Sequence, residues 1–277
     1  MNRLLSANFA RLKKDKAFWL GMALMFVFGI FLVVNGYLVA KKDGYEVPLD
    51  NFLFVHMQVI GVLSAVFCSL FVGTEYSDGT IRNKLVIGHN RSAIYFSNFI
   101  VCTAAGLLMS LSYTVAVSAV GIPLLGGPRS EMENIFLYSL AAGMMVLAIS
   151  AVFTLLSMSN QNKAVVAIIS VIGIFLLLFA AIDIFSKLNE PEIWDEYVYM
   201  DPSGQLVTGA AEPNPNYLRG WKRSAYEFLY DFLPTGQAFQ IARMNAKSFW
   251  LLPLYSLLVT VASTLGGLFI FHKKDLK

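Results

Sequence analysis

The chain has 277 residues, of which 57% are hydrophobic and only 14% are charged. Soluble domains are usually about 25% charged, so this composition excludes an ordinary soluble domain and indicates an integral membrane protein. The net charge is only +3, and the basic residues are not gathered in one tail, which argues against a nucleic-acid-binding protein. We therefore expect a single transmembrane domain over residues 1–277, with membrane lipids around it and no nucleic acid as a partner.

The first segment, residues 2–16, is polar and basic but carries a spaced set of apolar residues. Leu4, Leu5, Phe9 and Leu12 fall on one face of a helix, and basic side chains occupy the remainder. This pattern predicts an amphipathic helix that lies along the membrane interface. The alternative is a basic flank that only sets topology. We expect no cleavable signal peptide, because the apolar run that follows is too long and no Ala-x-Ala site comes after it.

Six apolar runs follow, and each is long enough to cross a membrane, which takes roughly 20 residues. Their continuous hydrophobicity predicts helices, because a transmembrane barrel would show alternating residues. The fold class is therefore an all-α integral membrane protein with six transmembrane helices. The predicted spans are Phe18–Ala40, Asn51–Val72, Ala93–Gly121, Asn134–Met158, Ala164–Phe185 and Phe249–Phe271.

The distribution of lysine and arginine predicts the orientation of these spans. If the N-terminus lies in the cytoplasm, the inner segments carry 12 of the 21 basic residues and the short outer loops carry only three. Short cytoplasmic loops are enriched in lysine and arginine, so both termini are expected inside the cell. The loop between spans two and three is then cytoplasmic as well.

That loop, residues 73–91, is too polar to lie within the membrane and has the pattern of a bend followed by a short helix. Gly79 permits a positive φ that other residues resist. Thr80 can cap a helix that begins at the next residue. Asp78 and Arg82 are four residues apart, which on a helix makes a modest stabilising pair.

Ile81 and Leu85 would form one apolar side of this short helix. An apolar side at the membrane surface has to be buried against something. A groove on a partner protein, the lipid interface and the neighbouring N-terminal helix are three alternatives that the residues alone leave open.

The sequence Glu-Tyr-x-x-Gly-Thr-Ile-Arg in this loop resembles the inner loop of type-2 ATP-binding-cassette (ABC) permeases, with a weaker likeness at residues 159–163. The resemblance implies that the loop is a coupling helix that receives force from a separate ATPase. Glu75 and Tyr76 would anchor the end of span two, Gly79 and Thr80 would make the bend, and Ile81, Arg82 and Leu85 would face the ATPase. The residues assigned to coupling are Glu75, Tyr76, Asp78, Gly79, Thr80, Ile81, Arg82 and Leu85.

Few ionisable side chains lie within the spans. His56 and Gln58 begin the second span, and Ser110 and Thr114 lie in the third. These four are candidates for a substrate path; the alternatives are a position at the interface and hydroxyls that bond back to helix carbonyls. A transporter driven by ions usually carries ionisable residues at membrane depth, so their scarcity argues against a secondary transporter.

The segment 186–248 between spans five and six is too long and too rich in aromatic residues for a simple loop. We expect an ordered extracellular cap, which either gates release of a substrate or anchors the fold as an aromatic belt. The turn residues in this segment are followed at 235–242 by a predicted capped helix at the outer surface.

The sequence has no catalytic motif, no metal-binding motif and no phosphate-binding loop, so it predicts a protein that is not itself an enzyme. The family resemblance implies that ATP and Mg bind to separate ABC ATPase subunits, and that a second permease copy or a related permease completes the transporter in the bacterial plasma membrane. The substrate would be an amphipathic peptide, a drug or a lipid-like molecule. The alternatives are a non-transporting sensor, immunity or assembly subunit that docks an ATPase, and a secondary transporter.

Overall fold

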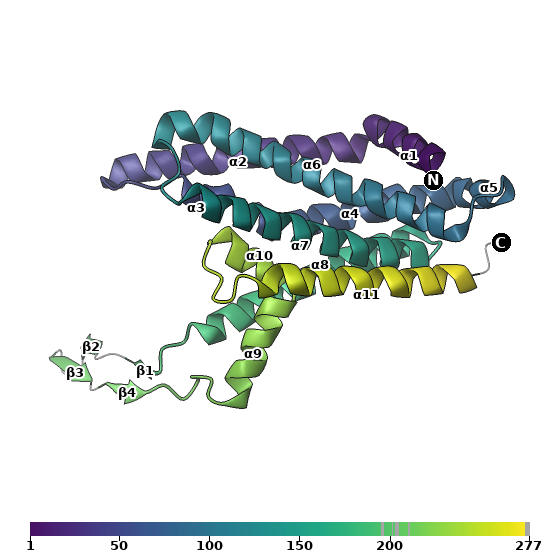
Figure 1. The fold of residues 1–277 in the computed structure, drawn as a ribbon. Helices are drawn as coiled ribbons and strands as arrows, with labels where there is room; N and C mark the ends of the chain where they lie inside the picture. The colour runs from purple at the N-terminus through teal and green to yellow at the C-terminus, as the bar shows by residue number, and fades with distance from the viewer. Residues whose placement is uncertain (195–196, 201, 203–204, 210, 275–277) are drawn as a thin grey trace.

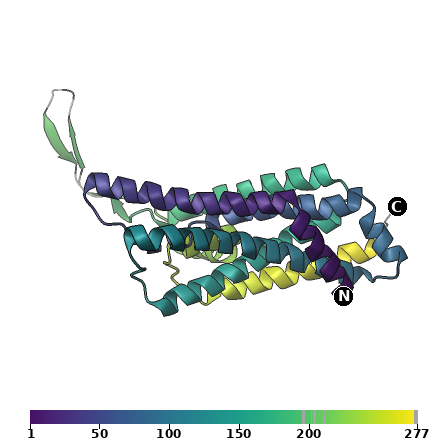
Figure 2. The ribbon, with the colours of Figure 1, turned by 90° about the horizontal axis from the view of Figure 1, so that it is seen from above.

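The computed structural model describes residues 1–194, 197–200, 202, 205–209 and 211–274. In this part of the chain, six helices are long and apolar enough to cross a membrane, and they run side by side in one bundle (Figures 1 and 2). The predicted all-α membrane fold with six spans is therefore confirmed. The six are α2 (Lys16–Asp43), α4 (Met57–Ser77), α6 (Arg91–Leu125), α7 (Met132–Ser159), α8 (Lys163–Leu188) and α11 (Leu251–Lys273).

Both termini lie at the same end of the bundle, which we call the terminal end; the opposite end is the far end (Figure 1). The short helix α5 (Thr80–Val86) joins α4 to α6 at the terminal end. The four-residue helix α3 (Asp50–Leu53) lies at the far end. This arrangement places the predicted coupling segment beside the N-terminal helix.

The N-terminal segment forms α1 (Asn2–Lys14), which meets α2 at a bend (Figure 2). Asp15 makes the bend in extended conformation, and its carboxylate accepts a hydrogen bond of 3.0 Å from the backbone N–H of Phe18, which caps α2. The expected apolar face exists, since Leu4 and Leu12 are buried. This face packs on α6, so the bundle itself covers much of it.

Polar caps define the starts of two further spans. Asn90 accepts a hydrogen bond of 2.7 Å from the backbone N–H of Ala93 and so caps α6. Asn162 accepts bonds from the backbone N–H groups of Ala164 and Val165 and caps α8. An asparagine at this position satisfies donors that a helix start leaves unpaired.

The second span differs from the prediction at both ends. It was expected at Asn51–Val72, but residues 54–56 form a turn after α3, and α4 begins only at Met57. At its other end α4 continues to Ser77. Its last turn therefore holds polar residues that hydropathy alone assigned to a loop.

The helices divide into an inner and an outer set. In the most apolar stretches of α4, α6 and α7, between 50% and 61% of residues are buried, against 22–28% for α2, α8 and α11. The outer set exposes large apolar side chains such as Phe31, Leu176 and Phe269. In a membrane, such faces contact lipid or another membrane protein.

The segment between α8 and α11 contains two antiparallel pairs and two helices. Strands β1 (Ile193–Trp194) and β4 (Glu212–Pro213) pair, as do β2 (Tyr197–Met200) and β3 (Leu206–Gly209). This ribbon projects away from the bundle (Figure 1). Helices α9 (Trp221–Phe232) and α10 (Pro234–Ala242) lead back to α11.

Helix α10 confirms the helix predicted at 235–242, but Leu233 and not Thr235 precedes it, and the bundle buries it almost completely. The Thr235 hydroxyl donates to the Leu177 carbonyl at 2.9 Å, and the Ser256 hydroxyl donates to Gln237 Oε1 at 2.7 Å. Gly236 lets α10 approach the preceding helix, because a Cβ there would lie 2.2 Å from the Tyr230 carbonyl oxygen. The expected cap is thus an embedded helix together with a projecting ribbon.

Candidate coupling site at the terminal end

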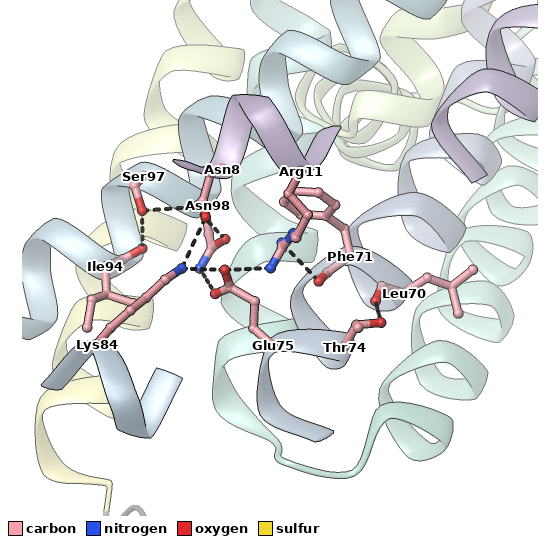
Figure 3. Close-up of polar contacts among 10 residues, drawn as sticks. All are labelled: Asn8, Arg11, Leu70, Phe71, Thr74, Glu75, Lys84, Ile94, Ser97 and Asn98. Atoms are coloured by element: carbon pink, nitrogen blue, oxygen red, sulfur yellow. Dashed lines mark hydrogen bonds and ion pairs between the residues drawn. The ribbon is translucent and has the colours of Figure 1, made fainter. Parts of the chain in front are cut away.

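A buried carboxylate lies at the centre of the terminal end. Glu75 is in the last turn of α4, and its side chain is completely shielded from solvent. Its Oε1 lies 2.6 Å from Arg11 of α1 and also contacts the Lys84 ammonium of α5. Its Oε2 accepts a hydrogen bond of 2.9 Å from Asn98 of α6. Glu75 thereby joins α4 to α1, α5 and α6, and Figure 3 shows these contacts.

Asn8 forms a second layer of this cluster. Its amide donates to Ser97 Oγ at 3.1 Å and to Asn98 Oδ1 at 3.2 Å, both on α6. Its oxygen accepts from Lys84 at 3.1 Å (Figure 3). Every side chain in the set therefore bonds to at least two others or to the backbone, which is the condition under which buried polar networks stabilise a structure.

Arg11 is held from three directions. Besides Glu75, its guanidinium donates to the Phe71 carbonyl at 3.2 Å and lies 3.6 Å above the centre of the Phe71 ring. Such a cation–π contact adds stabilisation when the cation is partly desolvated. The N-terminal helix is consequently fixed to the end of α4 by charge, hydrogen bonding and stacking.

The charges explain why an acid is tolerated here. A carboxylate in the last turn of a helix is disfavoured by the helix dipole, and burial disfavours it further. Arg11 and Lys84 both compensate Glu75. Burial lowers the pKa of Lys84 below its ordinary value, although the Glu75 carboxylate opposes this shift. We call Asn8, Arg11, Glu75, Lys84 and Asn98 the Glu75 cluster.

Gly79 makes the predicted bend, with a φ of +67°. It is also the residue that precedes α5, so the helix begins at Thr80 and not, as expected, at Ile81 with Thr80 as its cap. Asp78 and Arg82 are both exposed, and no ion pair joins them in the described part of the chain.

The apolar side of α5 is covered by the chain itself. Ile81 is only 1% exposed and belongs to the core, and Leu85 packs against that core. The expectation that Ile81 faces a partner is therefore wrong for this structure, whereas Leu85 is half-buried. Helix α5 packs mainly against α4 and α6, and not against the N-terminal helix that was one of the alternatives. The periodicity identified the apolar side but not what covers it.

Tyr76 secures the opposite side of α4. Its hydroxyl donates to the Met158 carbonyl at the end of α7 at 2.7 Å. Lys274, just after α11, donates to the Tyr76 oxygen at 3.3 Å and to the same carbonyl at 3.1 Å. The Lys163 ammonium at the start of α8 donates to Thr74 Oγ1 at 3.0 Å. The predicted anchoring of the span end by Tyr76 agrees with these contacts.

The outward surface of this region consists of residues that the sequence pattern mostly missed. Val86 and Ile87 are 79% and 77% exposed, and Arg82 and Asn83 are exposed beside them. We call these four residues the α5 tip. The sequence did carry a signal for this surface. Val86 and Ile87 are apolar residues directly before Gly88, and they are out of phase with the apolar side formed by Ile81 and Leu85.

A recess of about 150 Å³ lies next to the α5 tip. Glu75, Tyr76, Ile81 and Arg82 line it together with Gln161 from the turn between α7 and α8. The two inner loops of the sequence thus lie side by side here. Among the described residues, no group of three histidine, cysteine, aspartate or glutamate side chains is placed to hold a metal ion.

The four candidates for a substrate path are only partly brought together. His56, Ser110 and Thr114 line one groove towards the far end, whereas Gln58, which is half-buried, does not line it. The Ser110 and Thr114 hydroxyls donate to the helix carbonyls of Gly106 and Ser110. The predicted back-bonding is therefore present alongside the groove.

The comparisons with known proteins agree with this architecture. The family described as "ABC-2 family transporter protein" matches residues 4–178, which is more than half of the chain. Curated proteins provide no match. The chain therefore belongs to the ABC-2 family and is a multi-pass membrane permease subunit of an ABC transporter. Its family membership implies association with an ABC ATPase partner, and members of the family are transport components that are generally not catalytic themselves.

Proposed function

Because the chain is an ABC-2 permease, we propose that it forms the membrane path of an ATP-driven exporter in the bacterial plasma membrane. The termini and α5 face the cytoplasm in this proposal, and the excess of basic residues at the terminal end supports that orientation. ATP and Mg bind to separate ATPase subunits. The substrate is an amphipathic peptide, drug or lipid-like molecule, which crosses by alternating opening between this chain and a second permease, identical or related.

The α5 tip is the proposed contact with the ATPase. It offers two exposed apolar residues, Val86 and Ile87, beside the Arg82 guanidinium, a combination that suits the core and rim of a protein interface. Ile81 and Leu85 have a different role, since they hold α5 on the bundle. The contact surface and the anchoring surface are therefore opposite sides of one short helix.

The Glu75 cluster is the proposed route by which force leaves this contact, and it is the observation that supports coupling most directly. A push on α5 reaches Lys84, which is ion-paired with Glu75 of α4 and hydrogen-bonded to Asn8 of α1. Rigid displacement of α5 must therefore move the ends of α4 and α1 with it, or break a buried ion pair.

The test uses the permease purified from native membranes in mild detergent with the ATPase that accompanies it. Arg82→Glu and Val86→Asp should each release the ATPase, because both place a negative charge in the contact. Val86→Leu is the matched control and should retain it, since it keeps the exposed apolar surface. Retention of the ATPase by both charged variants would contradict the assigned contact.

A second arm separates binding from coupling. Glu75→Gln lies outside the contact and should retain the ATPase while lowering the stimulation of ATP hydrolysis by an amphipathic substrate in proteoliposomes. An ATPase that binds but never responds to any tested amphiphile, in the unmodified protein, would instead favour a sensor, immunity or assembly subunit. A permease that purifies with no ATPase would contradict the whole proposal.

A further inference from the structure

A groove opens sideways between α6 and α7 near the far end of the bundle. Its volume is about 240 Å³, and its walls include Leu111, Gly143 and His56, the residue that directly precedes α4. Sites for drug-sized ligands usually measure roughly 300–1,000 Å³, so this groove has room for one chain or one compact group. Leu111 is 56% exposed, so the groove opens on the outer surface of the bundle.

The depth of the groove follows from helix geometry. Thr114 lies 11 residues from the end of α6, or about 16 Å at 1.5 Å per residue. Ser139 lies seven residues from the start of α7, or about 10 Å. The hydrocarbon core of a bilayer is about 30 Å thick, so the groove faces the leaflet at the far end. In the orientation proposed above this is the outer leaflet.

His56 is the least expected residue in this groove. It is only 2% exposed, and its ring stacks on Tyr113 with the ring centres 4.3 Å apart. The Tyr113 hydroxyl donates to the Phe52 carbonyl at 2.6 Å, which fixes the ring against which His56 lies. Within the described part of the chain, His56 Nδ1 makes no hydrogen bond of normal geometry, although the ring interacts with the backbone of Leu53. A buried polar atom of this kind is costly unless a bound molecule satisfies it.

The hydroxyl groups that line the groove share one property. Ser110, Thr114 and Ser139 each donate their single proton to the helix carbonyl four residues earlier. A hydroxyl that has donated its proton retains lone pairs, so towards the groove it acts as an acceptor. Among the residues that the structure describes, no lysine, arginine, aspartate or glutamate lines the groove. The lining therefore complements an uncharged group with hydrogen-bond donors, attached to an apolar chain.

We propose that this groove binds an uncharged single-chain amphiphile with hydroxyl donors, of the monoacylglycerol class, which enters sideways from the lipid. The hydroxyls of the ligand bond to His56 and to the three acceptor hydroxyls, and the first part of its chain lies against Leu111 and Gly143. This inference rests on the groove alone and does not require the ATPase contact proposed above.

The test is photo-cross-linking of the full-length protein in lipid vesicles. The probe is a monoacylglycerol with a diazirine on the carbons next to the head group, and the matched probe is the methyl ester of the same acyl chain, which has no hydroxyl donors. The monoacylglycerol should label α6 and α7 beside the groove several-fold more than the lipid-facing surface of α8. An excess of unlabelled 1-monooleoylglycerol should abolish the preferential labelling of α6 and α7. The methyl ester should label the groove and the lipid-facing surface of α8 equally.

Two variants and one control sharpen the result. Gly143→Leu should abolish the excess, because a Cβ there meets no neighbouring side chain of the described residues within 4 Å and the larger side chain would extend into the groove that Gly143 lines. Gly173→Leu on α8, where a Cβ also meets nothing within 4 Å, is the control and should change nothing. His56→Phe keeps the stacked ring but removes its nitrogens, and should weaken binding about fivefold, the factor that corresponds to one net hydrogen bond.

Three results would overturn the proposal. Equal labelling of the groove and of α8 by the monoacylglycerol would show that no site exists. Equal labelling of the groove by both probes, unchanged in His56→Phe, would show an apolar crevice without polar recognition. Absence of any label in the groove, together with disulfide-linked pairs of the Gly143→Cys variant, would show that a second copy of the chain covers it; the native Cys68 and Cys102 are buried and do not interfere.

Discussion

Replacement of Glu75 by glutamine is the most informative single perturbation of this protein. The variant keeps the shape of the side chain but removes the charge that faces Arg11 and Lys84. Removal of one partner from a buried ion pair typically costs about 3–5 kcal/mol. The side chains of Arg11 and Lys84 remain 29% and 12% exposed, so water partly solvates the cations left behind. We therefore expect the lower end of that range, about 3 kcal/mol.

This loss can be measured by thermal unfolding in mild detergent. For chains of this size, 1 kcal/mol lowers Tm by about 2–4 °C, so Glu75→Gln should lower it by about 6–12 °C. The matched control is Asp78→Asn, which removes the same charge three residues further on, where the side chain is exposed. Such surface substitutions change stability by less than about 0.5 kcal/mol.

The variant should also loosen α1. If Glu75 fixes the N-terminal helix, limited trypsin digestion after Arg11 should be faster in Glu75→Gln than in the unmodified protein and in Asp78→Asn. Equal Tm shifts for Glu75→Gln and Asp78→Asn, or unchanged digestion, would refute the assignment of Glu75 as the joint between these helices.

Three further predictions concern single positions, each checked by thermal unfolding. Gly79→Ala should destabilise by about 1–2 kcal/mol, because alanine resists the positive φ; an unchanged Tm would mean that the bend can relax. Gly267→Ala places a Cβ 2.2 Å from the Tyr95 hydroxyl oxygen and should cost about 1–3 kcal/mol, whereas the neighbouring Gly266→Ala meets its nearest atom at 3.5 Å and should be neutral or stabilising. Burial lowers the pKa of Lys274 from its ordinary value of 10.5 to about 8. Between these two pH values the unfolded chain therefore binds more protons than the folded one. The stability of the protein relative to Lys274→Met should therefore rise as pH increases from 8 to 10.5, and a constant difference would contradict this.

The six spans could be predicted because membrane insertion imposes a simple condition on sequence. Each run such as Ala164–Phe185 is apolar throughout, and no soluble alternative has that composition. The ends of the helices were less predictable, because the hydropathy of the sequence can fall several residues before the helix ends. Helix α4 continues to Ser77, past the predicted end at Val72, because its last turn packs against other helices, with Glu75 buried and Thr74 and Tyr76 half-buried.

The Glu75 cluster could be predicted only in part. The motif marked Glu75 as important, but its partners Arg11 and Asn98 lie 64 and 23 positions away, and no local rule selects them. Local propensity also misplaced the start of α5. Thr80 is a good capping residue by type, but the residue that precedes the helix has a positive φ, and Gly79 occupies that position. In both cases the tertiary structure determined a detail, the partners of Glu75 or the start of α5, that local sequence rules could not.

The two adjacent residues Glu75 and Tyr76 explain how the end of α4 can act as a mechanical junction. Neighbouring residues on a helix point about 100° apart, so the two side chains reach different neighbours. Glu75 bonds to α1, α5 and α6, whereas Tyr76 bonds to the end of α7 and to Lys274 after α11. The first set is held by a buried ion pair, worth several kcal/mol if broken, and the second by neutral or singly charged hydrogen bonds worth about 1–3 kcal/mol each. In the proposed coupling, a load applied at α5 therefore reaches α1, α4 and α6 through Glu75, and α7 and the end of α11 through Tyr76.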